Sequence, residues 1–285
     1  MTVSRRLMMA TSSKGRYLAG TILRPAASIG HDYSARISAE LELMRRDVIR
    51  TLSRVWRETA QDGAAMDASP ASQSRIAINA LLRKWGPRFD RLAKTAADRM
   101  TERVLKNSTV TLGGSLKSAA EGLTLNADYM TDRIGEIVKA GTEQAANLIR
   151  LLPGQTLGAV QGDVMRAITE GQGLAELVPK LQLRYQAADR HAQLTAQDQV
   201  RKAYGNITAA KMRGLGIKRF EWVHSGGGQH PRKDHQRMNG KIYELDNPPL
   251  IGRMYGEDVY GKPGDLPNCR CTMRPILDFN FDDND

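Results

Sequence analysis

The chain has 285 residues, of which 41% are hydrophobic and only 5% are aromatic, and its formal charge at pH 7 is +11. This length leaves room for two modest domains, or for one domain with long extensions. The excess of basic residues, with a pI near 9.8, favours polyanionic partners such as nucleic acid or an acidic protein surface, and it also fits a basic protein without a nucleic-acid role. No apolar run approaches the length of about 18 residues that a membrane span needs, so we expect no membrane-spanning segment.

Basic residues gather near the N-terminal end, before the first acidic residue, Asp32. They are Arg5, Arg6, Lys14, Arg16 and Arg24. This pattern predicts a basic arm over residues 1–33 that faces a polyanion or serves in packing. An acid-poor, arginine-rich segment also fits an organellar transit peptide, although the apolar core of a secretory signal is missing. The opposite end, residues 278–285, predicts a short acidic tail.

A largely helical region is predicted over residues 34–155. Apolar residues recur at spacings of three and four, which is the period of one helix face, at Ile37, Leu41, Met44, Val48, Leu52 and Val55. The opposite face carries Arg45, Arg46, Arg50, Arg54 and Arg57. We interpret this basic face as solvated, or alternatively as a surface that contacts acidic protein or DNA phosphates.

Breaker residues divide the rest of this region. Gly63 and Pro70 border a predicted loop, and a second helix is expected from Ser74 to about Val104, with Pro87 kinking or dividing it. Residues 107–114 predict a loop. A third helix is expected over residues 128–152, because Pro153 and Gly154 resemble a helix stop.

The sequence pattern changes over residues 156–277, where shorter helices and strands are predicted. Three helices of moderate length are predicted at 156–170, 173–186 and 192–213. Alternating patterns predict strands at 218–223, 241–245 and 271–276. The fold class is therefore α+β, with a mostly helical N-terminal region followed by a small α+β module whose short sheet is confined to the C-terminal quarter of the chain.

Both cysteines of the chain, Cys269 and Cys271, are separated by one residue. A disulfide between them would be strained, so the pattern favours a reducing compartment. Together with His230 and His235, the two thiols offer four ligands suited to a tetrahedral zinc ion. The alternative is that the thiols are small core residues and the histidines make hydrogen bonds.

The same segment is a poor candidate for catalysis. A metal-dependent nuclease would need carboxylates placed to hold the metal. The nearby Asp234, Asp246, Glu257 and Asp258 have spacings that match no nuclease pattern. A nucleophilic pair of Cys269 and His235 is conceivable, but we predict no catalytic residues.

One ordered set of residues gives the segment a recognisable signature. The set is Trp222, His230-Pro-Arg232, His235, Asn239-Gly240, Pro248-Pro249, Pro263-Gly264 and Asn268-Cys-Arg-Cys271. Over roughly residues 156–277 this order resembles the phage Mu minor head protein F family, whose members are head-morphogenesis components of tailed phages and prophages. Two departures are visible. The run Gly226–Gln229 stands before His230, where many relatives have a charged run, and the segment Ala196–Gln199 resembles the family's helix motif but has glutamine where an arginine is usual.

The resemblance implies a structural role. Such proteins associate with the portal, capsid and scaffold proteins during procapsid assembly, which implies a virion location, and non-specific contact with packaged DNA is expected. The motif residues then act as scaffold: Arg232 would clamp a carboxylate or a backbone carbonyl, and Gly240, Pro263 and Gly264 would set turns. Residue Arg270 belongs to the same motif.

Two other functions stay open on the sequence. One is a metal-dependent nuclease, or another DNA-processing enzyme, that acts at packaging or ejection. The other is a dedicated DNA-binding protein, which would contact phosphates because no helix-turn-helix or finger array is present. In either case the predicted organisation is an arm at 1–33, a helical region at 34–155, the Mu F-like module at 156–277 and a tail at 278–285.

Overall fold

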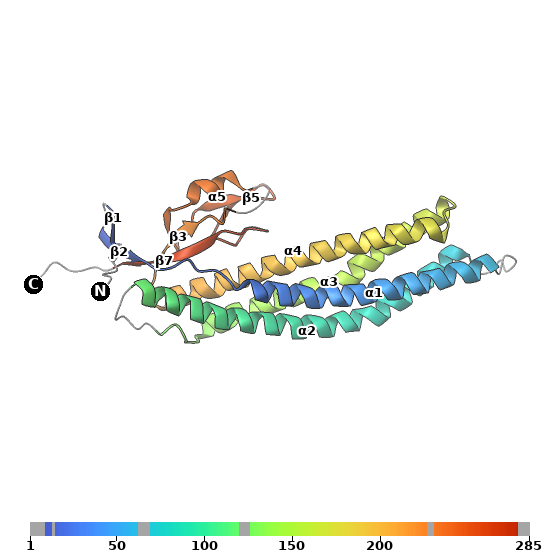
Figure 1. Cartoon of the computed structure of the whole chain (residues 1–285), viewed down its shortest axis with the longest axis horizontal. Coiled ribbons are helices and arrows are strands. Elements are labelled where there is room, and N and C mark those ends of the chain that lie inside the picture. Colours follow the sequence, from blue (N-terminus) through green and yellow to red (C-terminus); the bar gives the residue numbers. More distant parts are fainter. Residues whose placement is uncertain (1–8, 13–14, 62–68, 120–125, 227–230, 279–285) are drawn as a thin grey trace, which may run out of the picture. The chain divides into compact units, whose positions relative to one another are not determined.

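The computed structural model describes residues 9–12, 15–61, 69–119, 126–226 and 231–278 (Figure 1). Four long helices dominate these residues: α1 (Ala27–Gln61), α2 (Pro70–Ala119), α3 (Asp132–Thr169) and α4 (Leu174–Gly214). One short helix, α5 (Lys233–Met238), lies among the C-terminal strands. Within these ranges, no helix combines the length and the apolar character that crossing a membrane requires. The α+β fold class is confirmed.

The chain forms two compact units, each assembled from separate segments. Unit 1 contains Met1–Ile29, Thr101–Gly141 and Asp198–Asp285, and unit 2 contains Gly30–Met100 and Thr142–Gln197. All the described strands fall in unit 1, whereas unit 2 consists of helical segments. The four linear segments expected from the sequence stay a prediction.

A five-stranded antiparallel sheet forms the β part of unit 1. Its order is β1 (Met9–Ser12), β2 (Gly15–Ala19), β7 (Thr272–Asp278), β3 (Arg219–Val223) and β4 (Ile242–Glu244). A separate hairpin pairs β5 (Leu250–Met254) with β6 (Glu257–Tyr260). Strands at 219–223, 242–244 and 272–278 agree with the sequence prediction.

The confinement of strands to the C-terminal quarter was wrong, because part of the predicted arm is in the sheet. Strand β2 pairs with β7, so that Leu18 lies opposite Leu277, and Figure 1 shows these two strands side by side. Leu23 is then buried and bridges to Met273. An open β7 edge would leave backbone donors and acceptors unpaired, and β2 satisfies them.

The predicted loop at 107–114 is helical, and it continues α2 to Ala119. Its polar residues are used in packing within unit 1: Ser108 shares a hydrogen bond with Thr208 at 2.9 Å, and Thr111 shares one with Tyr204 at 2.6 Å. Leu112, which follows Thr111 directly, is fully buried. Hydroxyl groups that find partners on a neighbouring helix remove the cost that would otherwise favour a loop.

Prolines also fail to divide the helices. Helix α3 continues through Pro153, so the helices expected at 128–152 and 156–170 are one element. Helix α4 runs unbroken from Leu174 to Gly214 and contains Pro179, so the helices expected at 173–186 and 192–213 are also one element. Helix α2 likewise passes Pro87 without a break. The buried residues Leu157 and Val160 extend the apolar stripe of α3 beyond its proline. Burial of a continuous stripe outweighs the one hydrogen bond that a proline removes.

The apolar stripe of α1 is confirmed, since all six of its residues from Ile37 to Val55 are buried. Polar contacts join the helices of unit 2 along this stripe. The carboxylate of Asp47 accepts hydrogen bonds from Lys84 Nζ at 2.7 Å and from Trp85 Nε1 at 2.9 Å. These bonds fix the register of α2 against α1.

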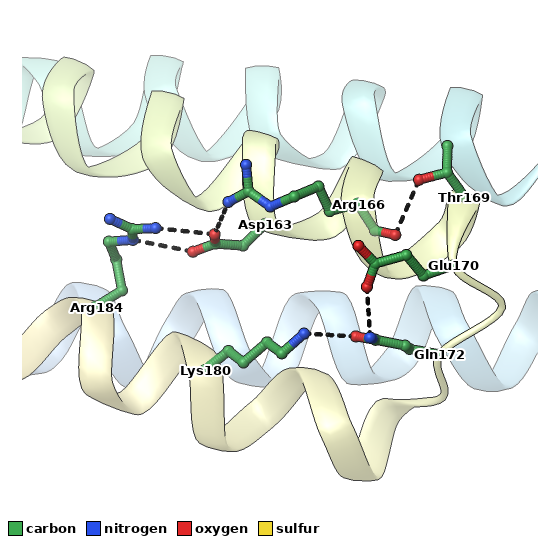
Figure 2. Close-up of polar contacts among 7 residues, drawn as sticks. All are labelled: Asp163, Arg166, Thr169, Glu170, Gln172, Lys180 and Arg184. Atoms are coloured by element: carbon green, nitrogen blue, oxygen red, sulfur yellow. Dashed lines mark hydrogen bonds and ion pairs between the residues drawn. The ribbon is translucent and has the colours of Figure 1, made fainter.

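A buried carboxylate holds α3 against α4 near the turn that joins them (Figure 2). The side chain of Asp163 is 7% exposed, and its two oxygens accept hydrogen bonds from Arg184 at 2.9 Å each. Arg166 pairs with the same carboxylate from within α3. Burial by itself would raise the pKa of Asp163, but the two guanidinium groups outweigh it and lower that pKa.

We expect Asp163→Asn to destabilise unit 2 by about 1–2 kcal/mol at pH 7, because the guanidinium group of Arg184 loses its charged partner. The effect is limited to this size because the Arg184 side chain is partly exposed and solvent screens the interaction. A lowered folded-state pKa gives stability that is present above the unfolded value of about 3.9 and is lost as pH falls. Urea unfolding at pH 7 and pH 3 measures both effects. The loss in the free energy of unfolding caused by Asp163→Asn should be smaller at pH 3 than at pH 7. The control Asp90→Asn, which removes an exposed carboxylate of the same unit, should leave the free energy of unfolding unchanged at both pH values. An equal loss at both pH values would contradict the assignment.

Candidate functional site: a buried Cys/His cluster

Three side chains that can bind a metal meet in the core of unit 1. They are His235 from α5 and the two cysteines from the extended segment before β7, and all three are buried. The Nδ1 atom of His235 lies 3.4 Å from Cys269 Sγ and 3.6 Å from Cys271 Sγ. Residues i and i+2 of an extended segment point to the same side, which is why both sulfurs reach one ring nitrogen. Within the described ranges, no other group of three such side chains occurs.

The imidazole of His235 is held on two sides. Its ring contacts the indole of Trp222 edge-on, with the centroids 5.0 Å apart and the planes at 73°. Its Nε2 lies 3.1 Å from the carbonyl oxygen of Ile251 at the start of the β5–β6 hairpin. Because a carbonyl only accepts, Nε2 carries the proton and donates it, which leaves Nδ1 as an acceptor that faces the two sulfurs.

The two thiols share protons unequally. The pKa of Cys269 is lowered to about 4, chiefly by the hydrogen bond from Cys271 and also by His235 and the Gly264 amide, against the opposing effect of burial. The same hydrogen bond, together with burial, raises the pKa of Cys271 above its ordinary value. The cluster therefore gives up one proton readily and holds the second.

Helix α4 positions the loop that carries Cys269. The Asp198 carboxylate is buried, accepts a hydrogen bond from the backbone N–H of Asn268 at 2.7 Å, and pairs with Lys202 at 3.0 Å. The backbone of Asn268 has φ +58°, a left-handed conformation that asparagine tolerates better than most residues. The carboxylate thus secures the turn that aims Cys269 inward.

Close backbone approach fixes the other side of the loop. A Cβ on Gly205 of α4 would lie 3.3 Å from the carbonyl oxygen of Pro263, so a larger residue there would require the loop to shift by a few tenths of an ångström. The next residue, Gly264, has φ +95°, which excludes most other residues. Arg232 Nη2 donates to the Pro267 carbonyl at 2.9 Å, which ties the start of α5 to the same loop.

The turn after α5 is bonded to strand β3. Gly240 has φ +76° and its N–H donates to the Trp222 carbonyl at 2.8 Å. The Asn239 side chain accepts from the backbone N–H of His224 at 2.8 Å. Trp222 itself is fully buried. The signature residues therefore surround His235 and hold its loops in place.

Comparison with known proteins identifies this arrangement. Residues 158–274 match the family described as "Phage Mu protein F like protein". This part of the chain is similar to the Mu F-like family, as its signature residues predict. The Mu F-like region, residues 158–274, includes the Asp198 helix segment, the Cys/His cluster and all the loops that support it.

A curated relative extends the similarity beyond this region. An uncharacterized protein of Haemophilus influenzae (strain ATCC 51907 / DSM 11121 / KW20 / Rd) is 28% identical over 254 residues, which is 87% of this chain and 53% of that protein. The chain thus spans about half the length of the relative that it matches. No solved structure matches the chain.

The structure describes only part of the predicted site. His230, the fourth metal ligand expected from the sequence, lies outside the described residues, so the cluster of the Mu F-like region is defined by three side chains. Arg270 lies between the cysteines and is exposed. Of the predicted phosphate contacts, Arg5, Arg6 and Lys14 also lie outside the described residues, and of Arg16 only its backbone in β2 is described.

The basic face of α1 is partly neutralised by its own helix. Arg45 and Arg46 both bond to Glu42, at 2.6 Å and 2.9 Å, and these bonds lower the pKa of Glu42 to about 2. Arg54 lies 3.9 Å from Glu58. Arg50, Arg54 and Arg57 are exposed. These three are the better placed of the predicted partner contacts.

The carboxylates weighed for a nuclease do not converge. Asp234 pairs with Arg237 at 3.3 Å, Asp246 pairs with Arg213 at 2.6 Å, and Asp258 pairs with Arg253 at 2.7 Å, each at the surface. Glu257 is exposed on β6. Among the described residues these side chains form no metal-binding group with one another.

Sequence reasoning missed the role of Asp198. The segment Ala196–Gln199 was recognised as a helix motif, but its partner in the Asn268 turn lies 70 residues away in the chain. A buried acidic residue on a helix whose neighbours are Ala196 and Val200 would have been the available signal, because such a carboxylate needs a donor.

We expect Asp198→Ala to loosen the Cys269 loop without unfolding the chain, at a cost of about 1–3 kcal/mol, because the Asn268 amide loses a charged acceptor. Hydrogen exchange of peptides covering residues 264–272 should speed up by roughly tenfold or more, since 1.4 kcal/mol corresponds to a factor of ten. Asp246→Ala, which removes an exposed carboxylate of the same unit, should leave that exchange unchanged. Equal exchange in the two variants would disprove the role of Asp198.

Proposed function

We propose that this chain is a minor head protein of a tailed phage or prophage, which associates with the portal and with capsid and scaffold proteins during procapsid assembly and DNA packaging. The observation that carries the proposal is the match of residues 158–274 to the Mu F-like family. The family links the chain to phage head morphogenesis. On this proposal the protein is assembled in the bacterial host and resides in the phage head near the portal.

The mechanism in this proposal is binding. The signature residues are used to build the module: Trp222 and His235 are buried, Arg232 clamps a carbonyl, and Gly240 and Gly264 form turns. Each contact joins two segments of the chain. Such an arrangement supports a rigid module that presents its outer surface to other head proteins, and it supports a scaffold role over a nuclease.

The charge of the chain supports a second, weaker contact with packaged DNA. The formal charge is +11. Exposed Arg50, Arg54 and Arg57 lie at spacings of four and three on α1 and therefore share one face. Phosphates bound there would release counterions, so the contact would be independent of sequence and sensitive to salt.

The partner proposal predicts co-purification. When the chain is co-expressed with the portal protein of the same phage or prophage, we expect the two to elute together in size-exclusion chromatography. Long helices with a solvent-facing basic side offer a large surface for such a contact, and portal assemblies from an unrelated phage provide the control. A chain that elutes alone at micromolar concentrations of its own portal, capsid and scaffold proteins would contradict the proposal.

The DNA proposal predicts a salt slope. Replacing Arg50, Arg54 and Arg57 together with glutamine should lower the dependence of log K on log salt by up to about 2.7, since each phosphate contact contributes about 0.9. Fluorescence anisotropy with two unrelated duplexes measures the slope. A matched variant replaces exposed Lys117, Arg133 and Lys139 with glutamine, so that the net charge changes equally. Equal losses in both variants, or cleavage of the DNA with Mg²⁺ or Mn²⁺, would count against this mode of binding.

A further inference from the structure

We propose that His235, Cys269 and Cys271 bind one zinc ion that fastens α5 to the segment before β7. The inference concerns the stability of the module and stands independently of the proposed function. It starts from the distances between the ligand atoms. A tetrahedral zinc ion with Zn–S near 2.3 Å and Zn–N near 2.0–2.1 Å separates a sulfur and a nitrogen ligand by about 3.6 Å. The observed separations from His235 Nδ1 are 3.4 Å and 3.6 Å.

The tautomer of His235 suits a metal ligand. A ligating imidazole commonly donates its second N–H to a carbonyl or carboxylate, which orients the ring and leaves the other nitrogen free to bind. The His235 Nε2 contact with the Ile251 carbonyl at 3.1 Å is of this kind, and it comes from a separate hairpin. Nδ1 is thereby aimed at the space between the sulfurs.

The surroundings of the sulfurs suit thiolates. Backbone amides of Gly264 and Ser225 donate toward Cys269 and Cys271 respectively. The buried indole N–H of Trp222 has no oxygen or nitrogen partner within the described residues, and it faces Cys271 closely enough to favour the charged sulfur. Donors collected around two sulfurs compensate the negative charge that metal-bound thiolates carry.

The ligand types select the metal. Two thiolates and an imidazole favour zinc over calcium or magnesium, which prefer oxygen ligands. All three side chains are buried, which is the setting of a structural site. Three ligands leave one tetrahedral position for a further donor. The competing explanation of the two short distances is hydrogen bonding between the thiols and the imidazole without a metal.

A metal bound at this site would stabilise the short helix α5. Helix α5 has only six residues, and helices this short are unstable without external contacts. Its buried side chains are His235 and Met238. A metal bond from His235 to both cysteines would join α5 directly to β7, the strand that lies between β2 and β3 in the sheet. A small module with few aromatic residues gains most from such a cross-link.

The first experiment uses the whole chain, purified under reducing conditions without a metal-binding tag. Elemental analysis should find about one zinc per chain, the number expected of a single structural site. Replacement by Co²⁺ should give intense absorption in the near ultraviolet from thiolate-to-metal charge transfer, and visible bands typical of tetrahedral cobalt. A chain without zinc that also fails to form this cobalt spectrum would overturn the proposal and leave the thiol–imidazole hydrogen bond as the explanation.

Matched variants locate the site. His235→Asn, Cys269→Ser and Cys271→Ser should each lose the zinc and the charge-transfer band. His191→Asn, at an exposed histidine of α4, and Met238→Leu, at the other buried residue of α5, should keep both. Zinc retained at full occupancy in the three ligand variants would overturn the assignment. Since a ligand variant can fail to fold, the cobalt spectrum of the unmodified chain tests the proposal on its own.

Chelation provides a third measurement on the unmodified chain. Removing the metal should increase hydrogen exchange in peptides that cover residues 231–240 and 264–272, because both segments lose their shared anchor. Exchange in residues 142–197 of unit 2 should not change. An effect of chelator that is equal in all of these segments would contradict a local structural role.

Discussion

The antiparallel pairing of β3 with β7 is the constraint on which unit 1 depends. It places Trp222 opposite Met273 and puts both in the core. The candidate site is attached to these two strands at several points. Cys271 immediately precedes β7, His235 packs against Trp222 of β3, and the N–H of Gly240 donates to the Trp222 carbonyl. A shift of one residue in this register would turn Trp222 to the opposite face of the sheet and separate the ring from the sulfurs.

Helix α4 supplies the second support through polar groups that are buried and satisfied. Asp198 holds the Asn268 turn, and Thr208 bonds to Ser108 of α2. One turn further along, Lys211 is almost completely buried, and its ammonium donates to Thr109 at 2.6 Å and to the Ala127 carbonyl at 2.8 Å, while burial lowers its pKa. Buried polar groups cost free energy unless every one is paired, so these contacts restrict α4 to one position against its neighbours in unit 1.

These two supports explain why the signature of the Mu F-like region is compatible with a structural role. Its residues join segments that are distant in the chain. Arg232, His235 and Asn268 each form a hydrogen bond with a residue more than fifteen positions away in the sequence. A catalytic centre would need its polar groups directed to a shared open space that a substrate can enter. In the described residues these polar groups bond to other segments of the chain, which maintains the shape of the module.

The sequence by itself determined the fold class, the apolar stripe of α1, the three C-terminal strands and the resemblance to the Mu F-like family. These features depend on local periodicity and on an ordered set of residue types. The tertiary structure decided the features that depend on partners far away in the chain. Helices continue through Pro153 and Pro179 because a buried stripe outweighs a lost hydrogen bond. Residues 107–114 are helical because Ser108 and Thr111 find hydroxyl partners on α4. The basic N-terminal segment contributes β2 because β7 would otherwise have an open edge. The spacing of His235, Cys269 and Cys271 indicated a shared centre, but only the β3–β7 register and the Asp198 contact bring the ring nitrogen within 3.6 Å of both sulfurs, since no local pattern encodes which distant segments meet.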